Sequence, residues 1–125
     1  MARLLAESFL LLLELEWRMT FYELRSLHRR VHTAGVNVVE SPSLRSAEEI
    51  CRAVDLACIF YPKRVFCLQR SAAATILLRH SGIRAEMVIG AQLQPFRFHA
   101  WVELEGVVLN DRPYVRDIYQ TLERC

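Results

Sequence analysis

Three residues of reactive type lie far apart in the second half of the chain: Cys67, His99 and Asp111. A thiol, an imidazole and a carboxylate are the groups that nucleophilic acyl transfer requires, because an imidazole oriented by a carboxylate can take the proton of a thiol. We therefore interpret Cys67 as a nucleophile, His99 as its general base and Asp111 as the residue that orients the histidine, on condition that the fold brings the three together.

Cys67 lies near the expected start of a helix, since Pro62 should break one helical run and another resumes at about Val65. A helix N-terminus carries partial positive charge and unpaired N–H groups, which lower the pKa of a thiol and can stabilise an oxyanion. Further positive charge lies close by in the sequence, on Lys63, Arg64 and Arg70. The alternative interpretation is that Cys67 is a small buried apolar residue, which is the usual role of a cysteine inside a domain.

The stretch from His99 to Asp111 has the pattern of a β-hairpin that turns at residues 104–106. A three-residue loop with Gly106 in the left-handed region would place His99 directly opposite Asp111, with their Cβ atoms roughly 5 Å apart. A two-residue loop would shift the pair by one residue and leave it diagonal. The alternative is that His99 is half-buried sheet surface and that Asp111 is only a turn residue before Arg112-Pro113.

Other residues that could bind a metal or form disulfides lack the necessary pattern. His28 and His32 lie four residues apart on a predicted helix, but no third ligand is evident and a solvated basic face explains them, so we assign no metal site and no cofactor. Cys51 and Cys58 share one helix face and fit a core, and Cys125 is incidental. The four cysteines form no CxxC pair and no secretory signal precedes them, so we expect a reducing cytoplasm.

Helical patterns occupy the first two thirds of the chain. Helices are predicted over residues 2–18, 20–35, 46–60 and 65–79, with capping boxes at Thr20–Glu23 and Ser46–Glu49, a connector over 36–45 and Gly82 as a C-terminal cap. The N-terminal helix is rich in leucine and apolar on more than one side. Its apolar run is interrupted by Glu7 and is too short to span a membrane, and a lone Arg3 does not make a signal peptide.

Short β-favouring runs follow the helices. Strands are predicted over residues 83–89, 98–104 and 107–110, separated by residues 90–97 and 105–106, and a last short helix is expected within 114–125. Helices first and strands afterwards favour an α+β fold with a small antiparallel sheet. We expect a single domain over 1–125, with a helical part (1–60) and a catalytic helix plus sheet (61–125).

The overall composition excludes several classes of protein. Hydrophobic residues make up 53% of the 125 residues and charged residues 24%, which is typical of a packed globule and not of a disordered chain. The formal net charge is only +2 and no basic stripe is present, so we expect no nucleic-acid partner.

Five short segments around the three reactive residues resemble those of the lasso-peptide leader peptidases, the B proteins of lasso-peptide biosynthesis in the transglutaminase-like superfamily. The segments are Cys67-Leu68-Gln69-Arg70-Ser71, Leu78 to Ile83, Ala85 to Gly90, His99-Ala100-Trp101-Val102-Glu103 and Leu109-Asn110-Asp111. They occur in the family's order and spacing over roughly residues 60 to 115. The resemblance implies a transglutaminase-like, papain-like cysteine peptidase fold with the catalytic residues Cys67, His99 and Asp111.

The resemblance also implies a hydrolase that removes the leader from a ribosomally made precursor peptide, so that an ATP-dependent cyclase can close a macrolactam. Members of the family are fused to a leader-recognition domain or work with a separate recognition protein. Because the residues before Cys67 favour helices and not the strands of a recognition domain, we expect the stand-alone form. The implied partners are the precursor (leader) peptide, the separate leader-recognition protein and the lasso cyclase.

Two questions stay open at the level of sequence. Gln69, Gln94 and Tyr61 are possible side-chain donors to the oxyanion, but no pattern favours one of them over the backbone N–H of Cys67. The leucine-rich N-terminal helix is a candidate docking surface for the recognition protein, unless Leu5, Leu12 and Leu15 only complete the core. A transglutaminase-like acyl transferase and a catalytically idle peptide-binding module are the alternative functions.

Overall fold

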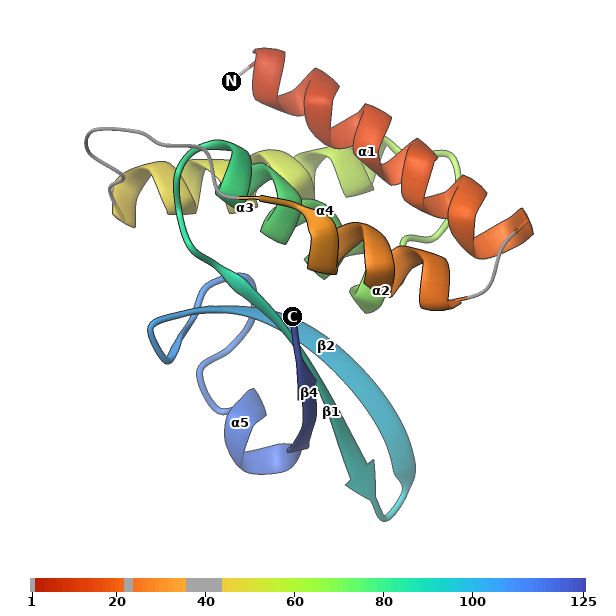
Figure 1. Cartoon of the computed structure of the whole chain (residues 1–125), viewed down its shortest axis with the longest axis vertical. Coiled ribbons are helices and arrows are strands. Elements are labelled where there is room, and N and C mark those ends of the chain that lie inside the picture. Colours follow the sequence, from red (N-terminus) through yellow and green to blue (C-terminus); the bar gives the residue numbers. More distant parts are fainter. Residues whose placement is uncertain (1, 22–23, 36–43) are drawn as a thin grey trace.

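The computed structural model of the chain describes residues 2–21, 24–35 and 44–125. Helices come first and strands afterwards, and Figure 1 shows the four long helices gathered above a twisted antiparallel sheet. The elements in chain order are α1 (Ala2–Phe21), α2 (Leu24–Thr33), α3 (Leu44–Phe60), α4 (Cys67–His80), β1 (Glu86–Leu93), β2 (Phe96–Leu104), β3 (Val107–Val108), α5 (Val115–Ile118) and β4 (Gln120–Arg124). The α+β prediction is confirmed.

α4 is the central helix of the fold. Every side chain from Ala72 to Leu78 is buried, and the helix contacts α1, α2, α3 and the strands β1 and β2. Three consecutive alanines let neighbouring elements approach closely, while burial of each larger side chain such as Ile76 contributes about 1.5–3 kcal/mol. The helix that begins with Cys67 is therefore held rigidly on most of its surface.

Both ends of α4 agree with the helix boundaries predicted from Pro62 and Gly82. α3 ends at Phe60, two residues before Pro62, and α4 begins at Cys67. At the other end, the Gly82 N–H donates to the Arg79 carbonyl at 3.0 Å and the Ile83 N–H donates to the Leu78 carbonyl at 2.9 Å. Gly82 has a φ of 84°, so the predicted glycine cap is confirmed as a left-handed Schellman end.

Some predicted helix boundaries are wrong. α1 continues to Phe21, past the predicted end at Arg18, so Thr20 lies in the last turn of the first helix and does not start the second. α3 begins at Leu44, so Ser46 already lies inside the helix and cannot be its N-cap. Glu23 of the first capping box and most of the predicted connector lie outside the described residues.

The sheet has the order β3-β2-β1-β4, with every neighbouring pair antiparallel. β1 and β2 are longer than predicted, because the segment assigned to a connector over 90–97 pairs across the hairpin and only Gln94-Pro95 forms the turn. The predicted helix at the C-terminus is correct only for α5. Residues 120–124 form β4, since they can pair with the otherwise open edge of β1.

The hairpin between β2 and β3 has a two-residue loop, Glu105-Gly106, with Leu104 paired to Val107. Both loop residues have positive φ, 49° and 82°, as a type I′ turn requires. The three-residue loop predicted from the sequence is therefore wrong. No helix in the described part of the chain is long and apolar enough to cross a bilayer.

Candidate active site

Cys67 is the first residue of α4, and its half-buried side chain forms part of a cavity wall. Phe66 is the N-cap, with an extended backbone and no side-chain cap bond. The first bond of the helix runs from the Arg70 N–H to the Phe66 carbonyl at 2.9 Å. The earlier N–H groups of the helix therefore have no helical acceptor, and the thiol lies at the positive end of the helix dipole.

His99 and Asp111 form a close pair beside this helix end. The His99 Nε2 atom lies 2.5 Å from Asp111 Oδ2, and both side chains are about four-fifths buried, with exposed fractions of 23% and 21%. The imidazole also lies close enough to the Cys67 thiol for each group to shift the pKa of the other. Because Asp111 occupies Nε2, Nδ1 is the ring nitrogen left for the thiol. Cysteine, histidine and aspartate thus form one chain of contacts, although the predicted strand register is wrong.

Contact between the thiol and the imidazole favours ionisation of both. Burial raises the pKa of Cys67, but hydrogen bonds from His99 and from the N–H groups of Ala100 and Leu68, together with the histidine charge, bring it below its ordinary value. For His99, the bond with Cys67 raises the pKa, burial opposes the rise, and Asp111 adds to it. Both shifts move the pair toward a thiolate that faces an imidazolium.

Asn110 fixes the loop that carries Asp111. Its Oδ1 accepts a hydrogen bond from the Val102 N–H at 2.8 Å, and its Nδ2 donates to Ser71 Oγ at 3.1 Å. Ser71 Oγ in turn donates to the Ala100 carbonyl at 3.0 Å. The loop is therefore tied to β2 through Val102 and to α4 through Ser71.

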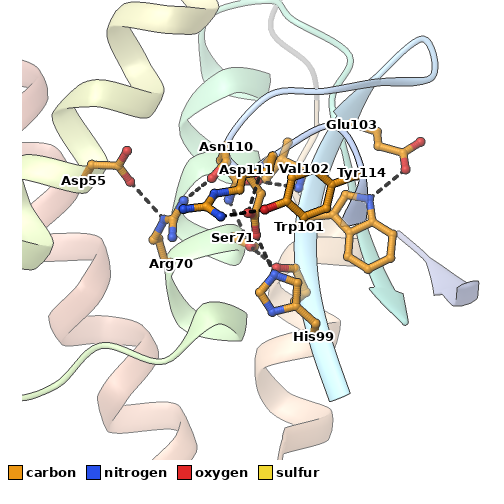
Figure 2. Close-up of polar contacts among 12 residues, drawn as sticks. Asp55, Arg70, Ser71, His99, Trp101, Val102, Glu103, Asn110, Asp111 and Tyr114 are labelled. Carbon is orange, nitrogen blue, oxygen red and sulfur yellow. Dashed lines mark hydrogen bonds and ion pairs between the residues drawn. The ribbon is translucent and has the colours of Figure 1, made fainter. Parts of the chain in front are cut away.

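Arg70 adds a second tie to the same loop. Its guanidinium donates to the Asn110 carbonyl and lies 2.9 Å from Asp55 Oδ1 on α3, and Figure 2 shows it between these two partners. The sequence resemblance contains Arg70, Ser71 and Asn110, but sequence reasoning counted Arg70 only as positive charge near Cys67 and assigned Ser71 and Asn110 no role. Ser71 lies four residues after Cys67 and therefore on the same face of the helix, and this spacing could have indicated a role for Ser71 beside the thiol.

Aromatic rings hold the imidazole from its other side. His99 stacks on Tyr119 with ring centroids 5.1 Å apart and on Trp101 at 6.1 Å. Trp101 is fully buried and donates from Nε1 to Glu103 at 2.7 Å. Gly90 makes room for this stack, because a Cβ atom there would lie 2.7 Å from the Trp101 ring. Sequence reasoning missed Tyr119, which lies in the segment between α5 and β4.

The cavity beside Cys67 and His99 has a volume of about 510 Å³ and mostly apolar walls. It is lined by Leu27 and His28 of α2, Cys67 and Leu68 of α4, Ile89 of β1, Phe98, His99 and Ala100 of β2, and Glu123 of β4. The one ion pair among these residues joins His28 Nε2 to Glu123 Oε1 at 2.9 Å. The site is thus open to a chain-like apolar ligand and presents its reactive groups on one wall.

The side chains considered as oxyanion donors do not line this cavity. Gln69 donates to the Leu12 carbonyl at 2.7 Å and ties α4 to α1, while the Tyr61 hydroxyl donates to Glu16. Gln94 lies exposed in the β1–β2 turn. The backbone N–H groups at the start of α4 are the donors that the structure offers near the thiol.

The remaining cysteines differ from Cys67 in their electrostatics. Burial raises the pKa of Cys51 and of Cys125 to about 11, and burial also raises that of Cys58. All four cysteines are free thiols. His28 and His32 stack with centroids 6.2 Å apart, and no cluster of three potential metal ligands occurs in residues 2–21, 24–35 and 44–125.

Comparisons with known proteins gave a family match and a curated relative. A family model described as the transglutaminase-like superfamily matches residues 9–124. Over 78 residues the chain is 37% identical to the microcin J25-processing protein McjB of Escherichia coli, an alignment that covers 60% of this chain and 38% of McjB. The match therefore spans well under half of that relative. No solved structure gives a significant match.

Proposed function

Because the chain belongs to the transglutaminase-like superfamily, we propose that it is a cysteine peptidase with Cys67 as nucleophile, His99 as general base and Asp111 as the orienting residue. The proposal depends on one observation, the continuous contact from the thiol through the imidazole to the carboxylate at the wall of a cavity. The lowered pKa of Cys67 supports it, since the thiolate is the nucleophilic form.

In the proposed reaction His99 holds the proton of Cys67, and the thiolate attacks the carbonyl carbon of the scissile peptide bond. The oxyanion that forms is stabilised by backbone N–H groups at the start of α4. The C–N bond then breaks and the amine leaves with the proton from the imidazolium. A water molecule, deprotonated by His99, hydrolyses the thioester and restores the free thiol.

We propose that the substrate is the leader–core junction of a ribosomally made lasso precursor peptide. The resemblance at the five segments and the identity with McjB, which is named as a microcin J25-processing protein, support this choice. Removal of the leader would free the core amine that an ATP-dependent cyclase needs for macrolactam closure. The free thiols fit a reducing cytoplasm as the place of action.

We further propose that a separate protein recognises the leader and docks on α1. Leu12 and Leu15 of this helix are fully buried in the core, so they are unavailable to a partner. Leu10, Leu13 and Trp17 are exposed by 65%, 42% and 58% and recur at helical spacing. Such an apolar stripe suits a protein partner, and a Trp17→Ala chain should lose the partner's effect on cleavage but keep its thiol reactivity.

The test is to incubate the chain with the precursor peptide encoded beside it, with and without the recognition protein, and to weigh the products by mass spectrometry. Free leader and core peptides whose masses add up to the mass of the precursor plus one water support the peptidase. A product joined to an added amine would instead identify an acyl transferase.

Cys67→Ala should abolish cleavage while the far-ultraviolet circular dichroism stays unchanged. Cys58→Ala is the matched control, since that partly buried thiol lies outside the cavity. Cleavage that persists in Cys67→Ala would refute Cys67 as the nucleophile. A chain that does not cleave and whose Cys67 thiol labels no faster than free cysteine at neutral pH would favour a peptide-binding module.

A further inference from the structure

The β1–β2 hairpin extends beyond the helices that cover the rest of the sheet, and its tip projects away from them in Figure 1. On the face that meets α4, Met87 and Val102 are buried in the main core, and Ala100 is buried between α4 and the sheet. The same face continues toward the tip, because paired residues of the two strands share a face and every second residue returns to it. We call this continuation the hairpin ledge; it consists of Ile89, Ala91, Leu93, Phe96 and Phe98.

The ledge is apolar and largely uncovered. Leu93, Phe96 and Phe98 are exposed by 75%, 61% and 59%. The two phenyl rings contact each other edge to face, with centroids 4.8 Å apart. Arg97 lies between them in sequence but on the opposite face of the strand, so the ledge itself carries no charged side chain. An exposed apolar surface of this kind is typical of a binding site.

The ledge is continuous with the cavity that holds the reactive thiol. Ile89 and Phe98 belong to the ledge and also line that cavity beside Cys67 and His99. From Ala100, whose N–H contacts the thiol, to Phe96 is four residues of strand, or roughly 13 Å at about 3.3 Å per residue. A ligand that reaches Cys67 in an extended conformation would therefore cross the ledge with about four of its residues.

The backbone of β2 is also open at this point. The Ala100 carbonyl accepts from Ser71 and the Val102 N–H donates to Asn110, so the backbone groups of these residues point away from β1. Because this direction alternates along a strand, the N–H and C=O of Phe98 point the same way. β3 pairs only with Glu103 and Leu104, and no other strand of the described residues pairs with this edge of β2.

From these observations we propose that the hairpin ledge is a substrate-binding site outside the catalytic centre. An extended stretch of the peptide substrate pairs with the β2 edge at Phe98 and packs apolar side chains on Phe98 and Phe96. These side chains belong to residues about two to four positions from the scissile bond. The inference rests on the proposed peptidase function and adds a specificity for apolar residues near the cut.

The test uses Phe96→Ser with Phe60→Ser as its matched control. Phe60 is a phenylalanine exposed by 69% at the end of α3, and Phe96 is exposed by 61%, so neither change removes a core contact. The first measurement is KM and kcat for the precursor peptide encoded beside the chain. The second is Kd of the fluorescein-labelled precursor for a Cys67→Ser background, which separates binding from hydrolysis.

We expect Phe96→Ser to raise KM and Kd about tenfold with kcat within about twofold, while Phe60→Ser changes none of them, because only the first removes an apolar contact with the ligand. Replacing the apolar precursor residues near the cut by serine should raise KM and Kd for the intact chain by a similar factor. For the Phe96→Ser chain, the serine-substituted peptide should show KM and Kd close to those of the unchanged peptide, since both changes remove the same contact.

The outcomes separate the ledge from the peptidase function. Cleavage that depends on Cys67 together with unchanged KM and Kd in Phe96→Ser would overturn the ledge and leave the function standing. If the intact chain does not cleave even when the recognition protein is present, the function fails, and Kd in the Cys67→Ser background still decides whether the ledge binds the peptide. If Phe96→Ser disperses a self-associated form in sedimentation without changing Kd, the face is an interface between copies and the proposal is wrong.

Discussion

Replacing Asn110 by alanine should loosen the loop that holds Asp111 against His99. The Asn110 side chain is buried and bridges two elements, accepting from the Val102 N–H at 2.8 Å and donating to Ser71 Oγ at 3.1 Å. Alanine can replace neither bond. The Val102 N–H would stay buried, since that residue has no exposed surface, and would lack a partner.

The free energy of unfolding should fall by about 2–4 kcal/mol. An unsatisfied buried donor costs about 1–3 kcal/mol, and loss of the bond to Ser71 adds about 0.5–1.5 kcal/mol. A domain of this size has a free energy of unfolding of about 5–15 kcal/mol, so most of the population should remain folded. The loop would keep the Leu109 N–H bond to the Val102 carbonyl and the Arg70 bond to the backbone of residue 110, and Asp111 would keep its contact with His99.

Two measurements check this reasoning. Urea unfolding gives the loss of stability, and the rate of Cys67 alkylation by iodoacetamide as a function of pH reports the thiol pKa in the folded protein. Gln92→Ala is the control, because it removes a side-chain amide whose bond to the Gln94 carbonyl is exposed, and it should cost less than about 0.5 kcal/mol.

The reasoning would be refuted if Asn110→Ala cost no more than the control. If stability falls as expected but the pH dependence of Cys67 alkylation equals that of the unchanged chain, the positioning role of Asn110 is refuted and its stabilising role stands. In that case Asn110 would stabilise the fold without positioning the carboxylate.

Two further changes test the pKa coupling and the aromatic stack. Asp111→Asn removes the carboxylate that helps to raise the imidazole pKa, so less imidazolium faces the thiol. The pKa of Cys67 should then rise, and the pH profile of its alkylation should move to higher pH. A profile that moves to lower pH would contradict the coupling. Gly90→Ala places a Cβ atom 2.7 Å from the Trp101 ring and should destabilise the fold by about 1–3 kcal/mol in thermal unfolding. Gly35→Ala is the control and should not destabilise the fold, because a Cβ atom there would meet nothing within 4 Å. Equal effects of the two substitutions would disprove the packing argument.

The sequence predicted the helix start at Cys67 better than it predicted the hairpin that carries His99 and leads to Asp111. Cys67 was placed correctly because Pro62 and Gly82 delimit its helix by local backbone rules. The contact between His99 and Asp111 was predicted from a three-residue loop, yet the loop has two residues. The contact exists because β3 ends at Val108 and the following residues leave the ladder, so strand register does not determine where the carboxylate lies.

The parts that sequence reasoning missed depend on long-range pairing. β4 forms because β1 has an open edge beside it, and nothing in the local pattern of residues 120–124 indicates which edge is free. Tyr119 reaches His99 only as a result of that pairing. Similarly, Asn110 and Ser71 are 39 residues apart, and an amide and a hydroxyl have no sequence signature for meeting in a fold.

The reactive groups and the hairpin ledge differ in how the fold holds them, and this difference has consequences for substitution. Cys67, His99 and Asp111 depend on buried contacts with α4 and β2, so changes among their supports should alter stability and reactivity together. Phe96 depends on no core contact, because it lies beyond the helices that cover the sheet. Substitutions there can alter which peptides bind while stability and thiol reactivity stay constant. The ledge can therefore vary in sequence to match a different substrate without disturbing the chemistry at Cys67.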